Sequence, residues 1–166
     1  QTAKVHGIKQ YKYVRDIIQP LLNFGRCLVH FAVDTDEVSM CTTLDGANSF
    51  FLPFNKGNNN GKGNPPNPFG HKSSYLWEEI FTRESLANII QHFVRFDGSP
   101  SDALSKRTLY FPRYHQLDVV RKLLSHASKN GVGNTYLIQH SAGSGKSNSI
   151  TWAAYQLIET YPERDG

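Results

Sequence analysis

The chain has 166 residues, which is the size of one ordinary domain or of pieces of two. Its 18 Lys and Arg residues against 14 Asp and Glu give a net charge of +4, which permits a nucleic-acid partner without demanding one. No apolar run approaches the roughly 18 residues of a membrane span, which argues against an integral membrane protein. The sequence starts without methionine and stops directly after a helix-like stretch, so we expect a segment of a longer protein.

The first part of the chain shows one helical and three strand-like patterns. Apolar residues at mostly helical spacing over 4–19, followed by Pro20, predict an amphipathic helix that ends near Gln19. Strand-like patterns then cover residues 26–33, 37–43 and 49–52. Because residues 34–36 are typical of a turn, the first two of these runs predict a β-hairpin, and the last predicts a third strand.

The cysteines and acidic residues of this part have plain structural explanations. Cys27 and Cys41 lie in strand-like runs and form neither a disulfide framework nor a metal-ligand pattern. We therefore predict buried thiols, which suit a reducing cytoplasm. The acidic residues in and next to the turn are Asp34, Asp36 and Glu37. They suggest a metal site, but a hairpin turn with solvated carboxylates is the simpler interpretation.

A segment rich in asparagine, glycine and proline covers residues 53–74. It predicts a long loop without regular elements, either functional or a mobile insertion. Thr82 is a predicted cap of the next helix, with Glu84 near the positive helix end. The predicted buried face of that helix consists of Leu86, Ile89, Ile90 and Phe93. Turn-forming residues over 97–108 predict a linker between two domains.

The second part of the chain follows the order helix, strand, glycine-rich turn, helix. Apolar spacing over 117–127 predicts a helix that stops at Asn130-Gly131. Residues 134–139 predict a short buried strand, and residues 150–161 predict another helix. The turn between them, residues 140–147, reads HSAGSGKS. A strand before such a turn and a helix after it are the context that a phosphate-binding P-loop requires.

Each residue type in the glycine-rich turn has a physical reason in a P-loop. Gly143 and Gly145 remove Cβ atoms where the backbone must approach a phosphate chain. Successive backbone N–H groups, including that of Ser144, then bind anions together with the positive end of the next helix. Lys146 supplies a cation for the β- and γ-phosphates, and the Ser147 hydroxyl suits Mg²⁺. The motif predicts ATP and Mg²⁺ as cofactors, with Lys146 as the catalytic residue; the alternative is a Gly-Ser linker.

Two further positions bear on this nucleotide site. The general motif begins with glycine, and this chain has His140 there, which weakens the match slightly. Gln116 lies upstream at a separation familiar in helicase motors, where a glutamine amide binds the adenine edge by donating and accepting together. Without the P-loop, Gln116 would be an ordinary residue of a helix surface. The acidic residue that holds Mg²⁺ on a second strand is missing, so we expect this segment alone to bind nucleotide weakly and to hydrolyse none.

Several stretches of the chain carry a resemblance to a known family. They are residues 24–34 (FGRCLVHFAVD), 51–57 (FLPFNKG), 63–68 (GNPPNP), 75–79 (YLWEE), 111–121 (FPRYHQLDVVR) and 136–147 (YLIQHSAGSGKS). These stretches resemble the R subunit, the restriction and motor subunit, of type I restriction-modification enzymes. The resemblance covers nearly the whole chain.

The resemblance implies an α/β fold divided between two domains. Residues 1–96 would be the C-terminal part of a PD-(D/E)xK nuclease domain, a helix plus a β-hairpin, and residues 97–108 a linker. Residues 109–166 would be the first βα unit of a RecA-like motor domain of superfamily 2 type. The catalytic Asp and Glu-x-Lys of the nuclease would lie upstream of Gln1.

The function implied by the resemblance is that of a type I site-specific deoxyribonuclease in the cytoplasm. Such a subunit moves double-stranded DNA with ATP, cleaves it far from the recognition site, and works with methyltransferase and specificity subunits. Two alternatives stay open. The first is another superfamily 2 helicase or translocase, which lacks the upstream Glu-x-Lys. Alternatively, residues 1–96 form a docking or regulatory module without catalysis, whose deletion would leave DNA cleavage intact.

Overall fold

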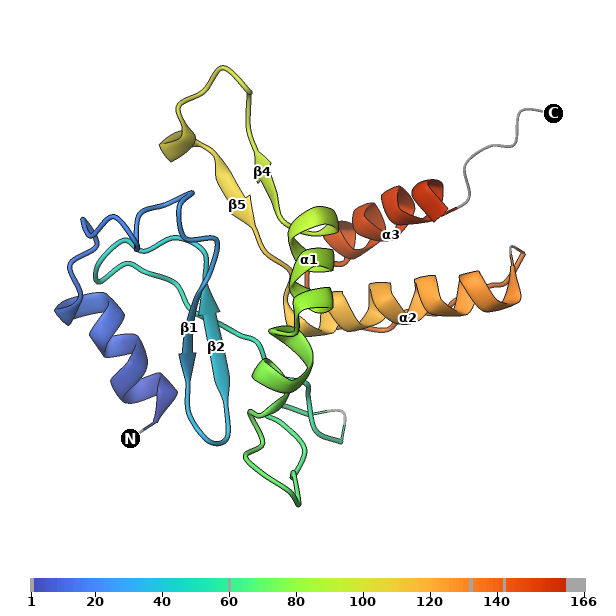
Figure 1. Cartoon of the computed structure of the whole chain (residues 1–166), viewed down its shortest axis with the longest axis horizontal. Helices are drawn as coiled ribbons and strands as arrows, with labels where there is room; N and C mark the ends of the chain where they lie inside the picture. Colours follow the sequence, from blue (N-terminus) through green and yellow to red (C-terminus); the bar gives the residue numbers. More distant parts are fainter. Residues whose placement is uncertain (1, 60, 132, 142, 161–166) are drawn as a thin grey trace. The chain divides into compact units, whose positions relative to one another are not determined.

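The computed structural model describes residues 2–59, 61–131, 133–141 and 143–160. The chain forms two compact units, residues 1–113 and 114–166. Figure 1 shows the elements along the chain, which in the described part combine helices with two small antiparallel sheets. The predicted mixture of helices and strands is therefore confirmed at the level of class. None of the helices in the described ranges is long and apolar enough to cross a membrane.

The first unit begins with two helical segments, η1 (Ala3–Gly7) and η2 (Gln10–Val14). The predicted helix was expected to reach Gln19, but it ends at Val14. The Asp16 carboxylate accepts a hydrogen bond from the backbone N–H of Ile18 at 2.9 Å. This local bond competes with the hydrogen bonds that would continue the helix, so the chain turns instead.

The predicted β-hairpin is present. Strand β1 (His30–Val33) pairs antiparallel with β2 (Val38–Cys41), and β2 pairs with β3 (Leu52–Pro53), which gives the order β1-β2-β3. Strand β1 starts later than the predicted residue 26. The chain turns at Gly25, directly before the predicted start, and the φ of +79° there is a conformation that glycine adopts without strain.

Asp34 fixes the turn of this hairpin. Its carboxylate accepts hydrogen bonds from the backbone N–H groups of Ala3 (2.6 Å), Asp36 (2.8 Å) and Glu37 (2.7 Å). Burial by itself raises the pKa of this carboxyl, but the three N–H donors and nearby Lys4 outweigh burial and hold the pKa below its ordinary value. Asp36 and Glu37 each form an ion pair with a lysine. The acidic turn therefore ties the N-terminal helix to the hairpin.

The core of the first unit contains a cluster of aromatic rings. The ring of Phe31 on β1 lies 5.2 Å from Phe54, 5.5 Å from Phe81 and 6.0 Å from Phe111, measured between centroids. All three pairs meet edge to face, which is a favoured arrangement of aromatic quadrupoles. Phe54 is completely buried, so this cluster anchors the start of the asparagine- and proline-rich segment in the core.

Two helical segments follow that loop, η3 (Leu76–Ile80) and α1 (Arg83–His92). Thr82 caps α1 as predicted, because its hydroxyl accepts a hydrogen bond from the Ser85 backbone N–H at 3.3 Å. Ile89 and Phe93 are fully buried, whereas Ile90 is 55% exposed. The apolar face of this helix is therefore narrower than predicted.

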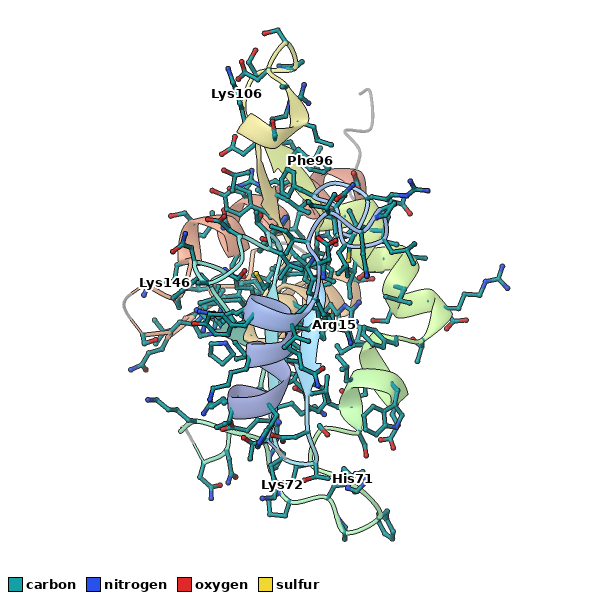
Figure 2. All side chains as sticks on the ribbon, turned by 90° about the vertical axis from the view of Figure 1, so that its left-hand side faces the viewer. Arg15, His71, Lys72, Phe96, Lys106 and Lys146 are labelled. Carbon is teal, nitrogen blue, oxygen red and sulfur yellow. The ribbon has the colours of Figure 1, made fainter. Side chains whose placement is uncertain are left out.

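The described residues of the 53–74 segment, 53–59 and 61–74, contact the rest of the first unit. The Asn64 amide is buried and bonds to groups of the same loop and of the hairpin turn. The Tyr75 hydroxyl donates to the Phe54 carbonyl at 2.6 Å, which closes the loop at its base. Lys72 pairs with Asp36 of the hairpin turn at 2.7 Å, and Figure 2 shows Lys72 beside His71 at the end of the loop.

Residues 97–108 also lie within the first unit. Strands β4 (Arg95–Asp97) and β5 (Thr108–Tyr110) pair antiparallel, and the short helix η4 (Leu104–Lys106) lies in the connection between them. The Arg107 guanidinium binds the Asp102 carbonyl at 2.9 Å and stiffens this connection. Residues 97–108, the predicted linker, therefore connect the two strands of a hairpin, and the second unit begins at Tyr114.

The second unit consists of two helices that pack against each other, α2 (Tyr114–Asn130) and α3 (Lys146–Thr160). Helix α2 ends where predicted. Gly131 has a φ of +73° and donates its N–H to the Ala127 carbonyl at 2.8 Å, as in a glycine C-cap. Helix α3 starts at Lys146, directly on the glycine-rich turn and earlier than the predicted residue 150.

The predicted buried strand over residues 134–139 is wrong. These residues belong to no strand and are exposed, Leu137 to 93%. A strand needs a neighbouring strand to pair its backbone N–H and C=O groups. None of the residues described in the second unit forms such a neighbour. The apolar pattern is present, but the partner that would bury it is not.

Candidate phosphate-binding loop

The candidate site is the turn that leads into α3. Gly143 and Gly145 have φ values of +71° and +77°, which glycine reaches without strain. Between them the Ser144 backbone N–H donates to the Ser141 carbonyl at 3.3 Å, so the chain reverses tightly before the helix. Both glycines that the sequence singled out therefore occupy backbone conformations that other residues rarely adopt. Ala142 lies outside the described residues.

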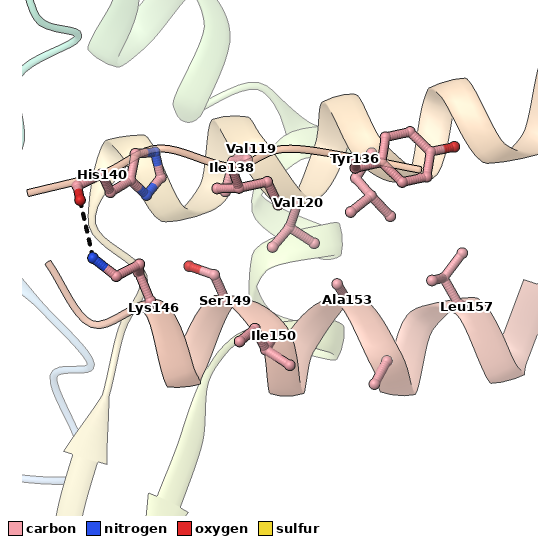
Figure 3. A pocket seen from close by; sticks show the side chains of 12 residues that line it. Val119, Val120, Tyr136, Ile138, His140, Lys146, Ser149, Ile150, Ala153 and Leu157 are labelled. Atoms are coloured by element: carbon pink, nitrogen blue, oxygen red, sulfur yellow. Dashed lines mark hydrogen bonds between the residues drawn. The ribbon is translucent and has the colours of Figure 1, made fainter. Parts of the chain in front are cut away.

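Lys146 is the first residue of α3 and reaches back across the turn. Its ammonium Nζ donates to the carbonyl oxygens of His140 at 2.9 Å and Ser141 at 3.2 Å. Figure 3 shows the first of these bonds. The side chain is exposed, and its present partners are neutral carbonyls rather than carboxylates. An anion at the loop would therefore offer the ammonium a stronger, charge-assisted hydrogen bond.

Gln116 comes from the first turn of α2 and lies against the loop. Its side chain is 4% exposed, and its amide nitrogen donates to the Ser144 carbonyl at 3.1 Å and the Gly145 carbonyl at 3.0 Å. The structure thus brings Gln116 together with the predicted loop residues. The contact is with the backbone of the loop, and the expected contact with adenine stays a prediction.

His115 was missed by the sequence reasoning. Its Nε2 lies 2.9 Å from the Ser144 carbonyl, and its ring meets the ring of His140 edge to face at 4.9 Å. The available signal was its position beside Gln116, on the same turn of the same helix. The interpretation of that segment rested on the glutamine alone, because an amide can donate to and accept from the adenine edge at once.

An apolar cavity of about 370 Å³ lies between α2 and α3, with the loop at one end. Its lining includes the apolar residues Val119, Val120, Leu123, Tyr136, Ile138, Ile150, Ala153 and Leu157. His140, Lys146 and Ser149 lie together at the loop end of this cavity (Figure 3). Apart from the Tyr136 hydroxyl, which lies 3.0 Å from His126 Nδ1, the side chains of the apolar lining offer no donors for phosphate oxygens, so the anion-binding groups lie at the loop.

The loop residues fit a magnesium–nucleotide on three observations. Gly143 leaves open space where a Cβ would stand, since no atom lies within 4 Å. The Ser144 hydroxyl is buried and has no hydrogen-bond partner among the described residues. Ser147 is exposed on the first turn of α3. The described residues contain no cluster of three or more His, Cys, Asp or Glu that could hold a metal, so Mg²⁺ would depend on phosphate oxygens besides Ser147.

Comparisons with models of protein families, with curated proteins and with solved structures gave no match to this chain. The site is therefore interpreted from its own geometry and from the sequence pattern.

Replacing Gly145 by alanine is expected to weaken phosphate binding about tenfold or more and to destabilise the second unit by about 1–3 kcal/mol. A Cβ at this position would stand 2.3 Å from the Gln116 amide nitrogen, in addition to the strain of a positive φ. Titration with Mg²⁺–ADP and denaturant unfolding measure the two effects. Gly143→Ala is the matched control, because it carries similar backbone strain but meets no atom. Equal damage by both variants would contradict the steric argument.

Proposed function

We propose that this chain is part of the DNA-translocating endonuclease subunit of a type I restriction enzyme, and that its loop binds the phosphates of ATP. One observation carries the nucleotide-binding part. The HSAGSGKS turn has both glycines at positive φ and ends at the N-terminus of a helix of 15 residues, with Lys146 as the first helical residue. Backbone N–H groups and the positive helix end favour an anion at such a position.

The residues that would hold the nucleotide are on the loop itself. The backbone N–H groups of Gly145 and Lys146 would be the donors for phosphate oxygens, joined by that of Ser144 if it leaves the Ser141 carbonyl, and the Ser147 hydroxyl would be a magnesium ligand. When bound, ATP supplies the free energy of hydrolysis that a motor uses for movement. Lys146 exchanges two neutral carbonyl partners for phosphate oxygens and offsets the negative charge there.

The larger assignment rests on the resemblance of the sequence stretches to the R subunit family. In that interpretation the first unit is the end of the nuclease domain, and the second is the start of the first RecA-like motor domain. The partners are double-stranded DNA and the methyltransferase and specificity subunits.

The test uses the intact subunit assembled with its methyltransferase and specificity subunits. We expect cleavage of unmodified DNA that requires both ATP and Mg²⁺, together with DNA-stimulated ATP hydrolysis. The matched control is the same assembly with ATP omitted. Cleavage that proceeds equally well without nucleotide would contradict the proposal. Translocation without any cleavage would favour the other superfamily 2 motors.

A further inference from the structure

The outer side of the loop is held by side chains from α2. A trans peptide bond places its C=O and the following N–H on opposite sides of the chain. The Ser144 carbonyl therefore points away from the Gly145 N–H, and the Gly145 carbonyl points away from the Lys146 N–H. Any group that fixes these two carbonyls also fixes the direction of the two N–H groups that follow them.

His115 and Gln116 are the groups that hold those carbonyls. His115 Nε2 lies 2.9 Å from the Ser144 carbonyl, and the Gln116 amide nitrogen lies 3.1 Å from the same oxygen and 3.0 Å from the Gly145 carbonyl. Since a carbonyl oxygen only accepts, the proton of the imidazole must be on Nε2. Two donors from one turn of α2 thus converge on two consecutive peptide groups.

His115 also contacts His140, at the start of the loop. Its ring packs edge to face against His140 with centroids 4.9 Å apart and an interplanar angle of 81°. The His140 carbonyl in turn accepts from the Lys146 ammonium at 2.9 Å. One side chain therefore contacts both ends of the turn, which stabilises the distance between them.

We propose that His115 is a positioning residue for phosphate binding. Together with Gln116 it forms a clamp on the carbonyl side of the loop, so that the N–H groups of Gly145 and Lys146 face the phosphate. His115 acts through the Ser144 peptide group and does not touch the phosphate. The inference rests on the proposed function, because a clamp has this role only if the loop binds nucleotide phosphates.

The experiment titrates the chain with Mg²⁺–ADP and, separately, with tripolyphosphate, and follows backbone amide signals by NMR. His115→Phe keeps a ring but loses the donor, and we expect its Kd to rise about five- to tenfold, with altered Gly145 and Lys146 amide signals. His115→Gln keeps an N–H donor and should bind nearly as well as the unchanged chain. His126→Phe is the matched control on the same helix, since His126 contacts Tyr136 rather than the loop.

The outcomes show whether the clamp alone or the proposed nucleotide binding as well is wrong. Unchanged binding by His115→Phe, while Lys146→Ala loses binding, would overturn the clamp and leave nucleotide binding intact. Binding by His115→Gln as weak as that of His115→Phe would also overturn it, because the donor would then not matter. His115→Leu is a second donor-free variant if His115→Phe does not fold. If the intact subunit binds neither Mg²⁺–ADP nor tripolyphosphate at millimolar concentration, both proposals fall together.

Discussion

Replacement of Lys146 by alanine is expected to lower ATP hydrolysis by the intact subunit about 100- to 1,000-fold and to stop DNA translocation. The variant removes the cation at the start of α3 that reaches across the loop. Negative charge on the transferring phosphate would then be stabilised by backbone N–H groups and Mg²⁺, without the lysine cation. Steady-state ATP turnover in the presence of DNA measures hydrolysis. Displacement of a strand bound to the DNA by the moving subunit measures translocation.

Lys122→Ala is the control for this variant. Lys122 is an exposed lysine of α2 that pairs with Asp118 at 2.7 Å. Exposed pairs of this kind contribute little to stability, so turnover should stay within about twofold of the unchanged subunit. ATP turnover that survives Lys146→Ala would contradict the assignment of the loop.

Replacement of Asn64 by alanine is expected to lower the free energy of unfolding of the first unit by about 3 kcal/mol. The Asn64 carbonyl accepts from the Lys56 backbone N–H at 2.8 Å, and its amide nitrogen donates to the Asp36 carbonyl at 2.8 Å and to Asn55 at 3.0 Å. Asn64 is only 5% exposed, so truncation removes three hydrogen bonds from a buried position. Denaturant unfolding followed by tryptophan fluorescence measures the loss.

Asn67→Ala in the same segment provides the comparison. Among the described residues, the Asn67 side chain bonds to nearby groups of its own turn, the Phe69 N–H and the His71 carbonyl, and Asn67 is less buried than Asn64. We expect its replacement to cost less than about 1 kcal/mol. Similar losses for both variants would mean that the Asn64 network does not hold this segment to the hairpin.

Local signals in the sequence predicted the local features of the fold. The β1–β2 hairpin, the Thr82 cap and the glycine stop after α2 each depend on residues close together in the chain. The two loop glycines were also singled out by their places in the P-loop pattern, and both have a positive φ. These features require no knowledge of distant partners.

The features that the sequence did not predict depend on distant partners. The pattern of residues 134–139 fits a buried strand, but burial requires a neighbouring strand that the described second unit lacks. Asn64 looks like one more turn residue in a segment of irregular composition, and only the fold shows that it bonds to the hairpin turn at Asp36. His115 likewise contacts the Ser144 carbonyl only because the fold brings the start of α2 next to the loop, 29 residues later in the chain.

The close approach of Gln116 to Gly145 means that the residue types tolerated at the two positions depend on each other. The glutamine amide occupies the volume that any Cβ at residue 145 would need. A larger residue at 145 is therefore compatible with this loop only if residue 116 becomes smaller or moves away. With the Gln116 side chain in its present position, glycine at 145 is required on two grounds, the space that the amide occupies and the positive φ.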